Sequence, residues 1–351
     1  MPTVSQKTPD KTGFKPKAIA KKLLSSLPER SRTVLEQRFG LGTNPQRVTL
    51  EAIGQRYGIT RERVRQIENH ALAALKKSPT FGEAASAFEE LERIIDSLGG
   101  IVCEDDLLNF ITKDASMQNH IYFLLVLGDP FKFRKEDDEV NRCWYVDADL
   151  AKQVESSLKT LYGGLSDEDL IPEGEMIDRF LKELQTINDK HRNDEILKRW
   201  LAISKNVGKN PLGEWGHSAS PNVKTKGVRD YAYLAVKKHG SPLHFREVAQ
   251  LIEKTFGRAA HVATTHNELI KDSRFVLVGR GMYALKEWGY TSGVVRDVVR
   301  EILRANGPLT KDEIIEKVMK ERHVKPGTIV VNLQNQKYFK RGKDGRFSLV
   351  K

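Results

Sequence analysis

Residues 48–79 read VTLEAIGQRYGITRERVRQIENHALAALKKSP, a stretch that predicts two short helices joined by a tight turn. Thr49 and Thr60 are typical N-caps, so helices are expected at residues 50–57 and from residue 61 toward residue 75. Gly58 between them supplies the left-handed backbone conformation that such a turn needs. The predicted structure is a helix-turn-helix, whose second helix presents its first residues to base edges in the DNA major groove.

The second helix has two faces of different character. Its apolar stripe consists of Val64, Ile67, Ala71, Leu72 and Leu75, at the spacing of a buried helix face. Its polar face carries Arg61, Glu62, Arg65, Gln66 and Asn69. The helix starts after Thr49 and Thr60 are expected to bind phosphate, as is the side chain of Arg63. Arg61 and Arg65 are expected to contact guanine or phosphate, Glu62 cytosine and Gln66 adenine. Asn69 lies on the same face.

Several ordered runs within residues 19–79 resemble region four of bacterial primary sigma factors. The runs are LPERSRTVL at residues 27–35, RFGL at 38–41, LEAIG at 50–54 and TRERVRQIE at 60–68. The resemblance implies that the second helix recognises a promoter element of the −35 type and that residues 23–39 dock on the flap of the RNA polymerase core. A helix-turn-helix from a repressor, or a helical hairpin that does not bind DNA, is the alternative.

No other segment resembles the sigma-factor regions that melt the promoter or hold the polymerase clamp. About 18 residues precede the match, and their abundance of Lys, Pro and Thr predicts a disordered basic tail. We therefore expect that this chain does not open a promoter with core polymerase alone.

The net charge of +11 is unevenly distributed along the 351 residues. Residues 1–80 carry 16 basic and 6 acidic side chains (net +10), residues 81–221 carry 16 and 28 (net −12), and residues 222–351 carry 26 and 13 (net +13). Basic segments favour polyanions as partners. Both ends are therefore expected to bind double-stranded DNA, whereas the acidic middle should be repelled by phosphate and serve as a spacer, a protein-binding unit or a shield.

Other functional classes lack support in the sequence. No apolar run approaches the roughly 20 residues of a membrane span, and the first 22 residues lack the apolar core of a signal peptide. Cys103 and Cys143 fit a reducing compartment as free buried thiols, although they could pair. The spacing of histidines, carboxylates and hydroxyls predicts no metal, no cofactor and no catalysis. We expect a cytoplasmic, nucleoid-associated protein that is not an enzyme.

Residues 81–351 repeat a pattern of three helices followed by a β-hairpin. An aromatic residue recurs on the last strand of each repeat, at steps of 71, 68 and 64 residues: Trp144, Trp215, Tyr283 and Phe347. This pattern is typical of winged helices, and we expect each aromatic side chain to fill a small core. The predicted fold class is mainly α with small β-hairpin wings, namely an N-terminal helix-turn-helix followed by about four tandem winged-helix-like units.

The third repeat carries a second resemblance. SPLHFREV at residues 241–248, RF at 274–275, GRGMYAL at 279–285 and Trp288 resemble the HARE-type helix-turn-helix. That module occurs in the delta subunit of some bacterial RNA polymerases, in restriction-linked proteins and in chromatin proteins. The predicted domains are a disordered tail (1–18), the sigma-like helix-turn-helix (19–80), two acidic winged-helix-like units (81–149 and 150–221), a HARE-like winged helix (222–290) and a C-terminal winged helix (291–351).

Four basic residues of the last two repeats lie near predicted helix starts or wing tips, where they are expected to contact phosphate: Arg246, Arg280, Lys343 and Arg346. The favoured function is recognition of promoter DNA together with bacterial RNA polymerase. Two alternatives remain open. One is the DNA-binding component of a restriction or modification system. The other is a delta-like subunit whose sigma-like domain contacts polymerase and not DNA.

Overall fold

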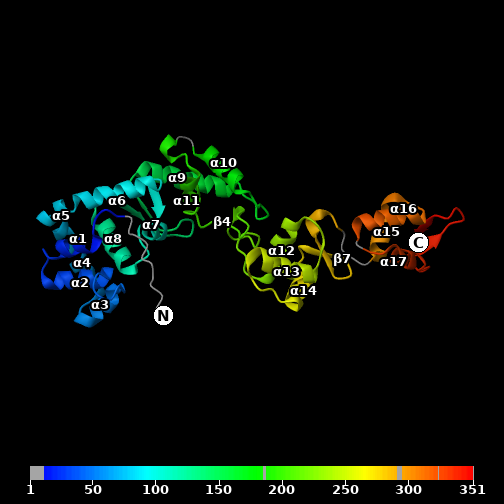
Figure 1. The fold of residues 1–351 in the computed structure, drawn as a ribbon, viewed down its shortest axis with the longest axis horizontal. Helices are drawn as coiled ribbons and strands as arrows, with labels where there is room; N and C mark the ends of the chain where they lie inside the picture. Colours follow the sequence, from blue (N-terminus) through cyan, green and yellow to red (C-terminus); the bar gives the residue numbers. More distant parts are fainter. Residues whose placement is uncertain (1–11, 185–186, 291–294, 323, 351) are drawn as a thin grey trace, which may run out of the picture. The chain divides into compact units, whose positions relative to one another are not determined.

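The computed structural model describes residues 12–184, 187–290, 295–322 and 324–350, and these form a mainly helical chain with small antiparallel sheets (Figure 1). The fold class predicted from the sequence is confirmed. The chain divides into two compact units, Met1–Gly208 with Trp215–Ser218 and Lys209–Glu214 with Ala219–Lys351. Residues 1–11 of the expected tail lie outside the described residues, and its last three residues belong to the first helix, which begins at Pro16.

The first unit opens with the helices of the expected helix-turn-helix, α1 (Pro16–Leu24), α2 (Glu29–Phe39), α3 (Leu50–Tyr57) and α4 (Arg61–Lys76). Val34, Ile53 and Val64 are fully buried between α2, α3 and α4. Gly58 adopts φ 64°, as the turn requires. Gly54 lies so close to the turn that an added Cβ would stand 2.6 Å from the carbonyl oxygen of Ile59. Both glycines therefore set the angle between α3 and α4.

The next elements of the first unit are α5 (Pro79–Glu83), α6 (Ala85–Ser97), β1 (Ile101–Cys103), α7 (Glu104–Ile111), α8 (Ala115–Leu127), β2 (Lys132–Arg134) and β3 (Cys143–Tyr145). Their strands form an antiparallel sheet in the order β1-β3-β2. The expected β2–β3 hairpin is confirmed, whereas β1 was not predicted, and its last residue, Cys103, was expected to begin the helix that starts at Glu104. The three residues of β1 are too few to show an alternating pattern, and the acidic residues that begin α7 follow them directly.

The first unit continues with α9 (Ala148–Gly163), α10 (Glu173–Glu183), the short 3-10 helix η1 (Asp189–His191), α11 (Asp194–Leu201), β4 (Val207–Lys209) and β5 (Trp215–His217). Trp200 and Phe180 are fully buried at the centre of these helices, with their ring centroids 6.5 Å apart. The β4–β5 hairpin takes the place of the wing that the sequence predicts here.

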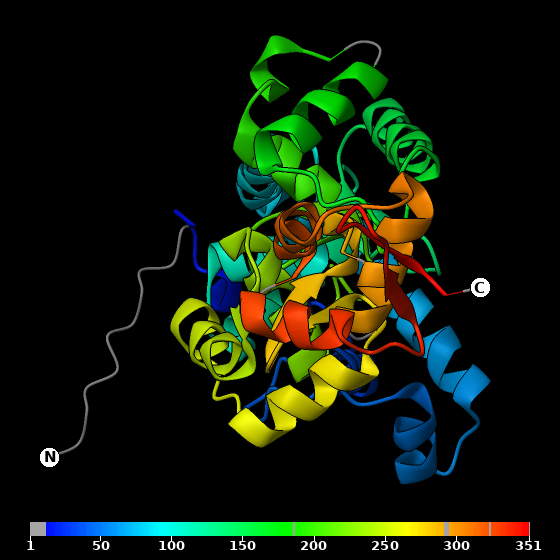
Figure 2. The ribbon, with the colours of Figure 1, turned by 90° about the vertical axis from the view of Figure 1, so that its right-hand side faces the viewer.

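The second unit contains α12 (Val228–His239), β6 (Leu243–His244), α13 (Phe245–Phe256), α14 (Val262–Lys271), β7 (Phe275–Gly279), β8 (Met282–Leu285) and η2 (Lys286–Trp288). It ends with α15 (Val295–Asn306), α16 (Lys311–Glu321), α17 (Pro326–Leu333), β9 (Phe339–Arg341) and β10 (Phe347–Leu349). Figure 2 views this unit from its C-terminal end, with α15 and α16 in orange and the β9–β10 hairpin in red.

The recurring aromatic residues occupy equivalent places in all four repeats. Each pairs across antiparallel strands or a single bridge with an apolar residue just before the second helix of its repeat: Val102 with Trp144, Ile171 with Trp215, Leu243 with Tyr283 and Leu309 with Phe347. This common register supports a repeated winged-helix-like unit. The domain boundaries themselves stay a prediction.

The expectation that each aromatic fills its core is wrong for Phe347. The other three aromatic side chains are buried, but Phe347 is only half-buried. Phe339, on the preceding strand β9, is fully buried and lies in the core formed by α15, α16 and α17. Because Phe339 occupies the core, Phe347 only packs against its edge and remains partly accessible to solvent.

The sigma-like helices share one hydrophobic core with the first winged-helix-like repeat. Leu23 of α1 and Leu35 of α2 lie in the same buried cluster as Phe123 and Leu124 of α8. The ring centroids of Phe39 and Phe123 are 5.3 Å apart. Most buried apolar side chains of residues 16–39 therefore lie in a core that extends beyond the boundary predicted at residue 80, whereas Val34 belongs to the core of the helix-turn-helix.

Polar contacts reinforce this junction. The Asn119 side-chain amide of α8 donates to the carbonyl oxygens of Gly40 (3.1 Å) and Pro45 (2.6 Å), in the loop that leads from α2 to α3. Arg47 in the same loop donates from Nε to Oδ1 of Asn119 at 2.8 Å, and its guanidinium lies 3.9 Å from the ring centre of Tyr122. Helix α8 thus holds both the core and the loop on which α3 depends.

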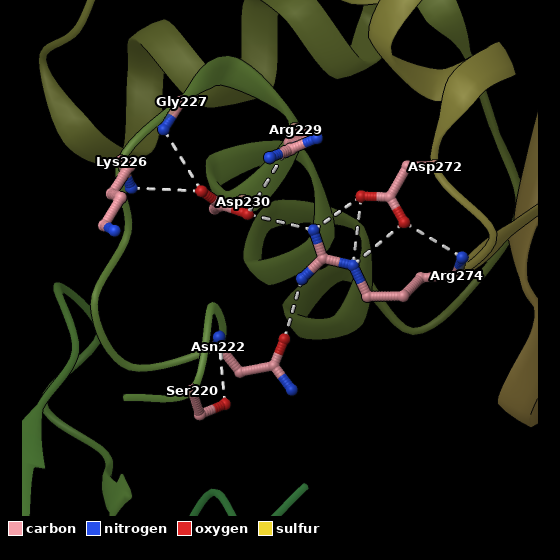
Figure 3. A network of polar contacts seen from close by, with 8 residues as sticks. All are labelled: Ser220, Asn222, Lys226, Gly227, Arg229, Asp230, Asp272 and Arg274. Carbon is pink, nitrogen blue, oxygen red and sulfur yellow. Dashed lines mark hydrogen bonds and ion pairs between the residues drawn. The ribbon is translucent and has the colours of Figure 1, made fainter. Parts of the chain in front are cut away.

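A buried ion network fixes the start of the second unit (Figure 3). The Arg274 guanidinium donates to Asp272 at 2.6 and 3.1 Å, to Asp230 at 3.0 Å and to Asn222 at 2.8 Å. Asp230 in turn accepts from the backbone N–H groups of residues 226 and 227 at 3.0 and 3.1 Å, which caps α12. Arg274 therefore ties the segment before α12 to the strand β7.

Within the part of the chain that the structure describes, no helix has the length and apolar character needed to cross a membrane.

Candidate nucleic-acid interface

The two threonines predicted as N-caps hold the starts of α3 and α4. The hydroxyl oxygen of Thr49 accepts from the backbone N–H of Ala52, and that of Thr60 accepts from the backbone N–H of Arg63, both at 3.2 Å. These contacts satisfy one amide of each first turn. The earlier amides of each helix point outward along its axis, where a phosphate would find N–H donors and the positive end of the helix dipole.

The polar face of α4 is exposed as predicted, and two hydrogen-bonded pairs involve it, Glu62 with Arg65 and Gln66 with Arg63. Arg65 donates from Nη2 and Nε to the two carboxylate oxygens of Glu62, at 2.7 and 2.9 Å. Arg63 donates to Oε1 of Gln66 at 3.1 Å. The hydrogen bonds from Arg65 lower the pKa of the Glu62 carboxyl, and those same bonds raise the pKa of Arg65.

The Glu62–Arg65 pair acts as one unit. Because Glu62 is an acceptor in an exposed ion pair, it holds the Arg65 fork in one direction while remaining accessible to solvent. An exposed pair of this kind contributes little to stability, and it leaves one Nη2 hydrogen and both Nη1 hydrogens of Arg65 as donors to a further acceptor. The sequence predicted Glu62 and Arg65 as separate base contacts, whereas the structure brings them together into one fork.

Arg61 and Asn69 lie at opposite ends of the same exposed surface. A residue at position 61 is in the first turn of α4, while position 69 lies two turns further along. The first turn enters a major groove most deeply in a helix-turn-helix. Asn69 therefore lies farther than Arg61 from the end of the second helix that a helix-turn-helix presents to DNA.

A polar cluster beside the helix-turn-helix was missed by the sequence reasoning. The Gln37 amide of α2 donates to the Tyr57 hydroxyl at 3.0 Å and accepts from Arg56 at 3.4 Å. Gln37 lies about twenty residues before the other two side chains, so no local pattern could have joined them. Their exposed donors make them candidates for phosphate contacts that position α4.

Two predicted phosphate ligands of the second unit lie near each other in the third repeat. The backbone N–H of Phe245 donates to the carbonyl oxygen of Gly281 at 3.0 Å, which brings the start of α13 to the β7–β8 turn. Arg246 follows Phe245 and Arg280 precedes Gly281, and both side chains are exposed. The turn needs Gly281, which adopts φ 72° and leaves no room for a Cβ beside His244.

The other two predicted ligands, Lys343 and Arg346, are exposed on the β9–β10 hairpin. A further basic cluster of the fourth repeat was not predicted. It surrounds the half-buried ring of Tyr338, whose centre lies 4.5 Å from the guanidinium of Arg296, 5.8 Å from that of Arg300 and 5.8 Å from Nζ of Lys337. Arg296 and Arg300 are 42 and 38 residues from Tyr338 in the chain, which explains why the sequence did not reveal the cluster.

Among the described residues, no group of three or more His, Cys, Asp or Glu side chains is arranged to hold a metal ion.

Comparison with known proteins agrees with this geometry. Residues 23–77 match the family model of sigma-70 region 4. Over 55 residues the chain is 44% identical to the RNA polymerase principal sigma factor HrdD of Streptomyces viridifaciens, which covers 16% of each chain. Over 66 residues it is 46% identical to the RNA polymerase sigma factor RpoD of Helicobacter pylori, which covers 19% of this chain and 10% of the relative. Over 74 residues it is 40% identical to RpoD of Neisseria gonorrhoeae, and the aligned segment covers 21% of this chain and 11% of the relative.

Residues 23–77 are therefore a sigma-70 region 4 module, and the match supports a DNA-binding role in transcription for this part of the chain. The chain spans only 10–16% of the length of these curated relatives. The resemblance of the third repeat to the HARE-type helix-turn-helix stays a prediction.

Proposed function

We propose that this protein recognises promoter DNA through α4 and acts in transcription initiation with RNA polymerase. The observation that carries the proposal is the exposed fork of Glu62 and Arg65 in the first turns of α4, within a sigma-70 region 4 module. Arginine that donates two hydrogen bonds to guanine is the commonest specific contact in the major groove. A carboxylate that holds the arginine in place lowers the entropy that it loses on binding.

Replacing Arg65 with alanine tests the role of this fork. We expect affinity of the full chain for a duplex that carries a −35-type element to fall by about 1–3 kcal/mol, with relaxed preference at one base position. The measurement is a titration against the duplex and against variants changed at single base pairs. Arg93→Ala is the matched control, because Arg93 is an exposed arginine of α6 in the same unit and outside the proposed interface. An equal loss on every duplex would instead assign Arg65 to phosphate.

The proposed contact with RNA polymerase involves residues 23–39. Apart from Val34, which lies between α2, α3 and α4, the buried apolar side chains of residues 23–39 lie in the core shared with α8, so they are not available to a partner while that core is intact. Contact with the polymerase flap through this segment would use its exposed polar residues, such as Glu29 and Arg30.

A reaction that contains only core polymerase and this chain should give no run-off transcripts from a linear promoter. Transcripts in that reaction would require a melting activity that the proposal does not contain.

We propose that the second unit binds backbone phosphates of the DNA outside the promoter element. Its exposed basic residues lie at helix starts and hairpin turns, positions that orient a protein on DNA without specifying sequence. The alternative, a delta-like subunit that binds polymerase only, predicts no such backbone contact. Nucleoid association is part of the DNA-binding proposal.

The number of phosphates that the second unit neutralises is measurable from salt dependence. In the full chain we expect that changing Arg246, Arg280, Lys343 and Arg346 together to glutamine makes the slope of log K against log salt shallower by about 0.9 for each phosphate that is no longer neutralised. Binding of a duplex without a promoter element should be measured from about 50 to 200 mM salt. A control with four exposed lysines of the acidic repeats changed to glutamine (Lys113, Lys135, Lys152 and Lys159) should keep the original slope. Equal slopes for the test variant and the unmodified chain would favour the delta-like alternative.

A further inference from the structure

Cys103 and Cys143 face each other across two neighbouring strands of the first unit. They are directly opposite in the antiparallel register of β1 and β3. The backbone N–H of Glu104 donates to the carbonyl oxygen of Arg142 at 3.1 Å, one residue outside the cysteine pair on each strand. This pattern makes Cys103 and Cys143 a non-hydrogen-bonded pair, the type in which side chains of antiparallel strands lie closest.

The two thiols differ in accessibility. The Cys143 thiol is completely buried, with its Sγ 3.8 Å from Sγ of Cys103 and 3.2 Å from the carbonyl oxygen of Asn141, and these two acceptors compete for its one hydrogen. Cys103 is half-buried and free, at the start of α7. Cα atoms of a non-hydrogen-bonded pair are about 4.5 Å apart, which lies within the range of about 4.4–6.8 Å found for disulfides. Rotation of the two side chains is therefore enough to bring the sulfurs to bonding distance.

We propose that Cys103 and Cys143 form a reversible oxidation site, at which a hydroperoxide converts the two thiols into a disulfide. The Cys103 thiolate attacks the peroxide, the O–O bond breaks, and Cys103 becomes a sulfenic acid while the other oxygen leaves as an alcohol or water. The Cys143 sulfur then attacks the Cys103 sulfur, the S–S bond forms, and the sulfenic hydroxyl leaves as water with the Cys143 proton. The two sulfurs lose two electrons in total, and the peroxide gains them.

The surroundings of the two sulfurs favour this order of steps. The hydrogen bond from Cys143 lowers the pKa of the Cys103 thiol, against the opposing effects of burial and of the carboxylates of Asp106 and Asp105. The same bond and burial raise the pKa of Cys143. The more accessible thiol, Cys103, is thus the more acidic one, and the buried Cys143 thiol keeps its proton until Cys103 has become a sulfenic acid. A small dithiol would reverse the reaction by thiol–disulfide exchange.

The disulfide would close a loop that supports the DNA-binding module. The two cysteines are 40 residues apart, and α7, α8 and β2 lie between them. Helix α8 packs against α1 and α2. A crosslink at the base of this loop restricts the unfolded chain, so oxidation should stabilise the unit that holds α4 without changing the native strand register.

The test treats the reduced full chain with a small excess of hydrogen peroxide and measures its intact mass under denaturing conditions. We expect a loss of about 2 Da in a monomer, failure of both cysteines to react with an alkylating reagent, and recovery of both after reduction. The thermal midpoint of the first unit should rise by roughly 5–15 °C, the shift that a loop of this length implies for a unit of this size.

Two single variants serve as controls. Cys143→Ala should leave Cys103 as a sulfenic acid, a gain of about 16 Da, or as a disulfide between two chains, and Cys103→Ser should leave Cys143 unmodified. The proposal is overturned if the unmodified chain gains oxygen at Cys103 while Cys143 still alkylates, or if neither thiol reacts. These readouts are masses, so they stand whether or not the chain binds DNA.

Discussion

Replacing Phe123 with alanine should destabilise the first unit by about 3–5 kcal/mol, the usual cost of removing a fully buried phenylalanine. Phe123 lies on α8, outside the sigma-like module, but its ring packs against Phe39 of α2 in the shared core. Loss of the ring leaves a cavity between α8 and α2. The helix-turn-helix should therefore lose stability together with the first winged-helix-like repeat.

Hydrogen exchange shows whether the helix-turn-helix is destabilised together with the first winged-helix-like repeat or behaves as an independent domain. In Phe123→Ala, amide exchange should accelerate in α1 and α2 as well as in α8, and the denaturation midpoint should fall. Phe133→Ala is the matched control, since the same side-chain change occurs at a phenylalanine that is 39% exposed, and it should have a much smaller effect. If α1 and α2 keep their protection while α8 loses it, the shared core does not couple them.

Replacing Arg274 with methionine should destabilise the second unit by about 3–5 kcal/mol, because it leaves buried carboxylates without their cation. Methionine fills part of the same volume but cannot donate hydrogen bonds. The side chains of Asp230 and Asp272 are 4% and 9% exposed, so solvent cannot replace the lost partner easily. The measurement is the free energy of unfolding from denaturant titration, with Lys254→Gln, an exposed site on α13, as the control.

The Arg274 effect should depend on pH in one direction. Burial alone would raise the pKa of Asp272, but its hydrogen bonds to Arg274 outweigh burial and hold this pKa below its ordinary value. A carboxyl with a lowered folded-state pKa contributes its full stability above the unfolded-state pKa, about 3.9, and loses it as pH falls toward the folded-state value. In Arg274→Met only burial acts on Asp272 and raises its pKa, so protonation on acidification relieves the unpaired charge there. The stability difference between the unmodified chain and Arg274→Met should thus be largest near neutral pH and shrink as the pH falls. A difference that grows on acidification would contradict this assignment.

The helix-turn-helix could be predicted almost residue by residue because its signals are local. Thr49 and Thr60 act as N-caps, and Gly58 takes the left-handed conformation, as their residue types indicate. The recurring aromatic residues also revealed the repeats, since a fixed place in a winged-helix core selects large apolar side chains. Phe347 is the exception, because the neighbouring Phe339 fills that core instead.

Features that depend on contacts distant in sequence could not be predicted. Strands β1 and β6 have three and two residues, too few for a period of two to be visible. The core shared with α8 joins segments more than 70 residues apart in sequence, as the contact between Phe39 and Phe123 illustrates. The Glu62–Arg65 fork is at helical spacing, but a sequence does not reveal whether two charged residues pair with each other or with DNA.

The central claim is that α4 selects a promoter sequence, and selection from a random pool of duplex DNA tests it most directly. The full chain should enrich one short motif that resembles the upstream hexamer of housekeeping promoters, and Arg65→Ala should lose enrichment at one position of that motif while Arg93→Ala keeps all of it. Enrichment of no motif, or of a motif that Arg65→Ala leaves unchanged, would contradict the claim that α4 specifies the site.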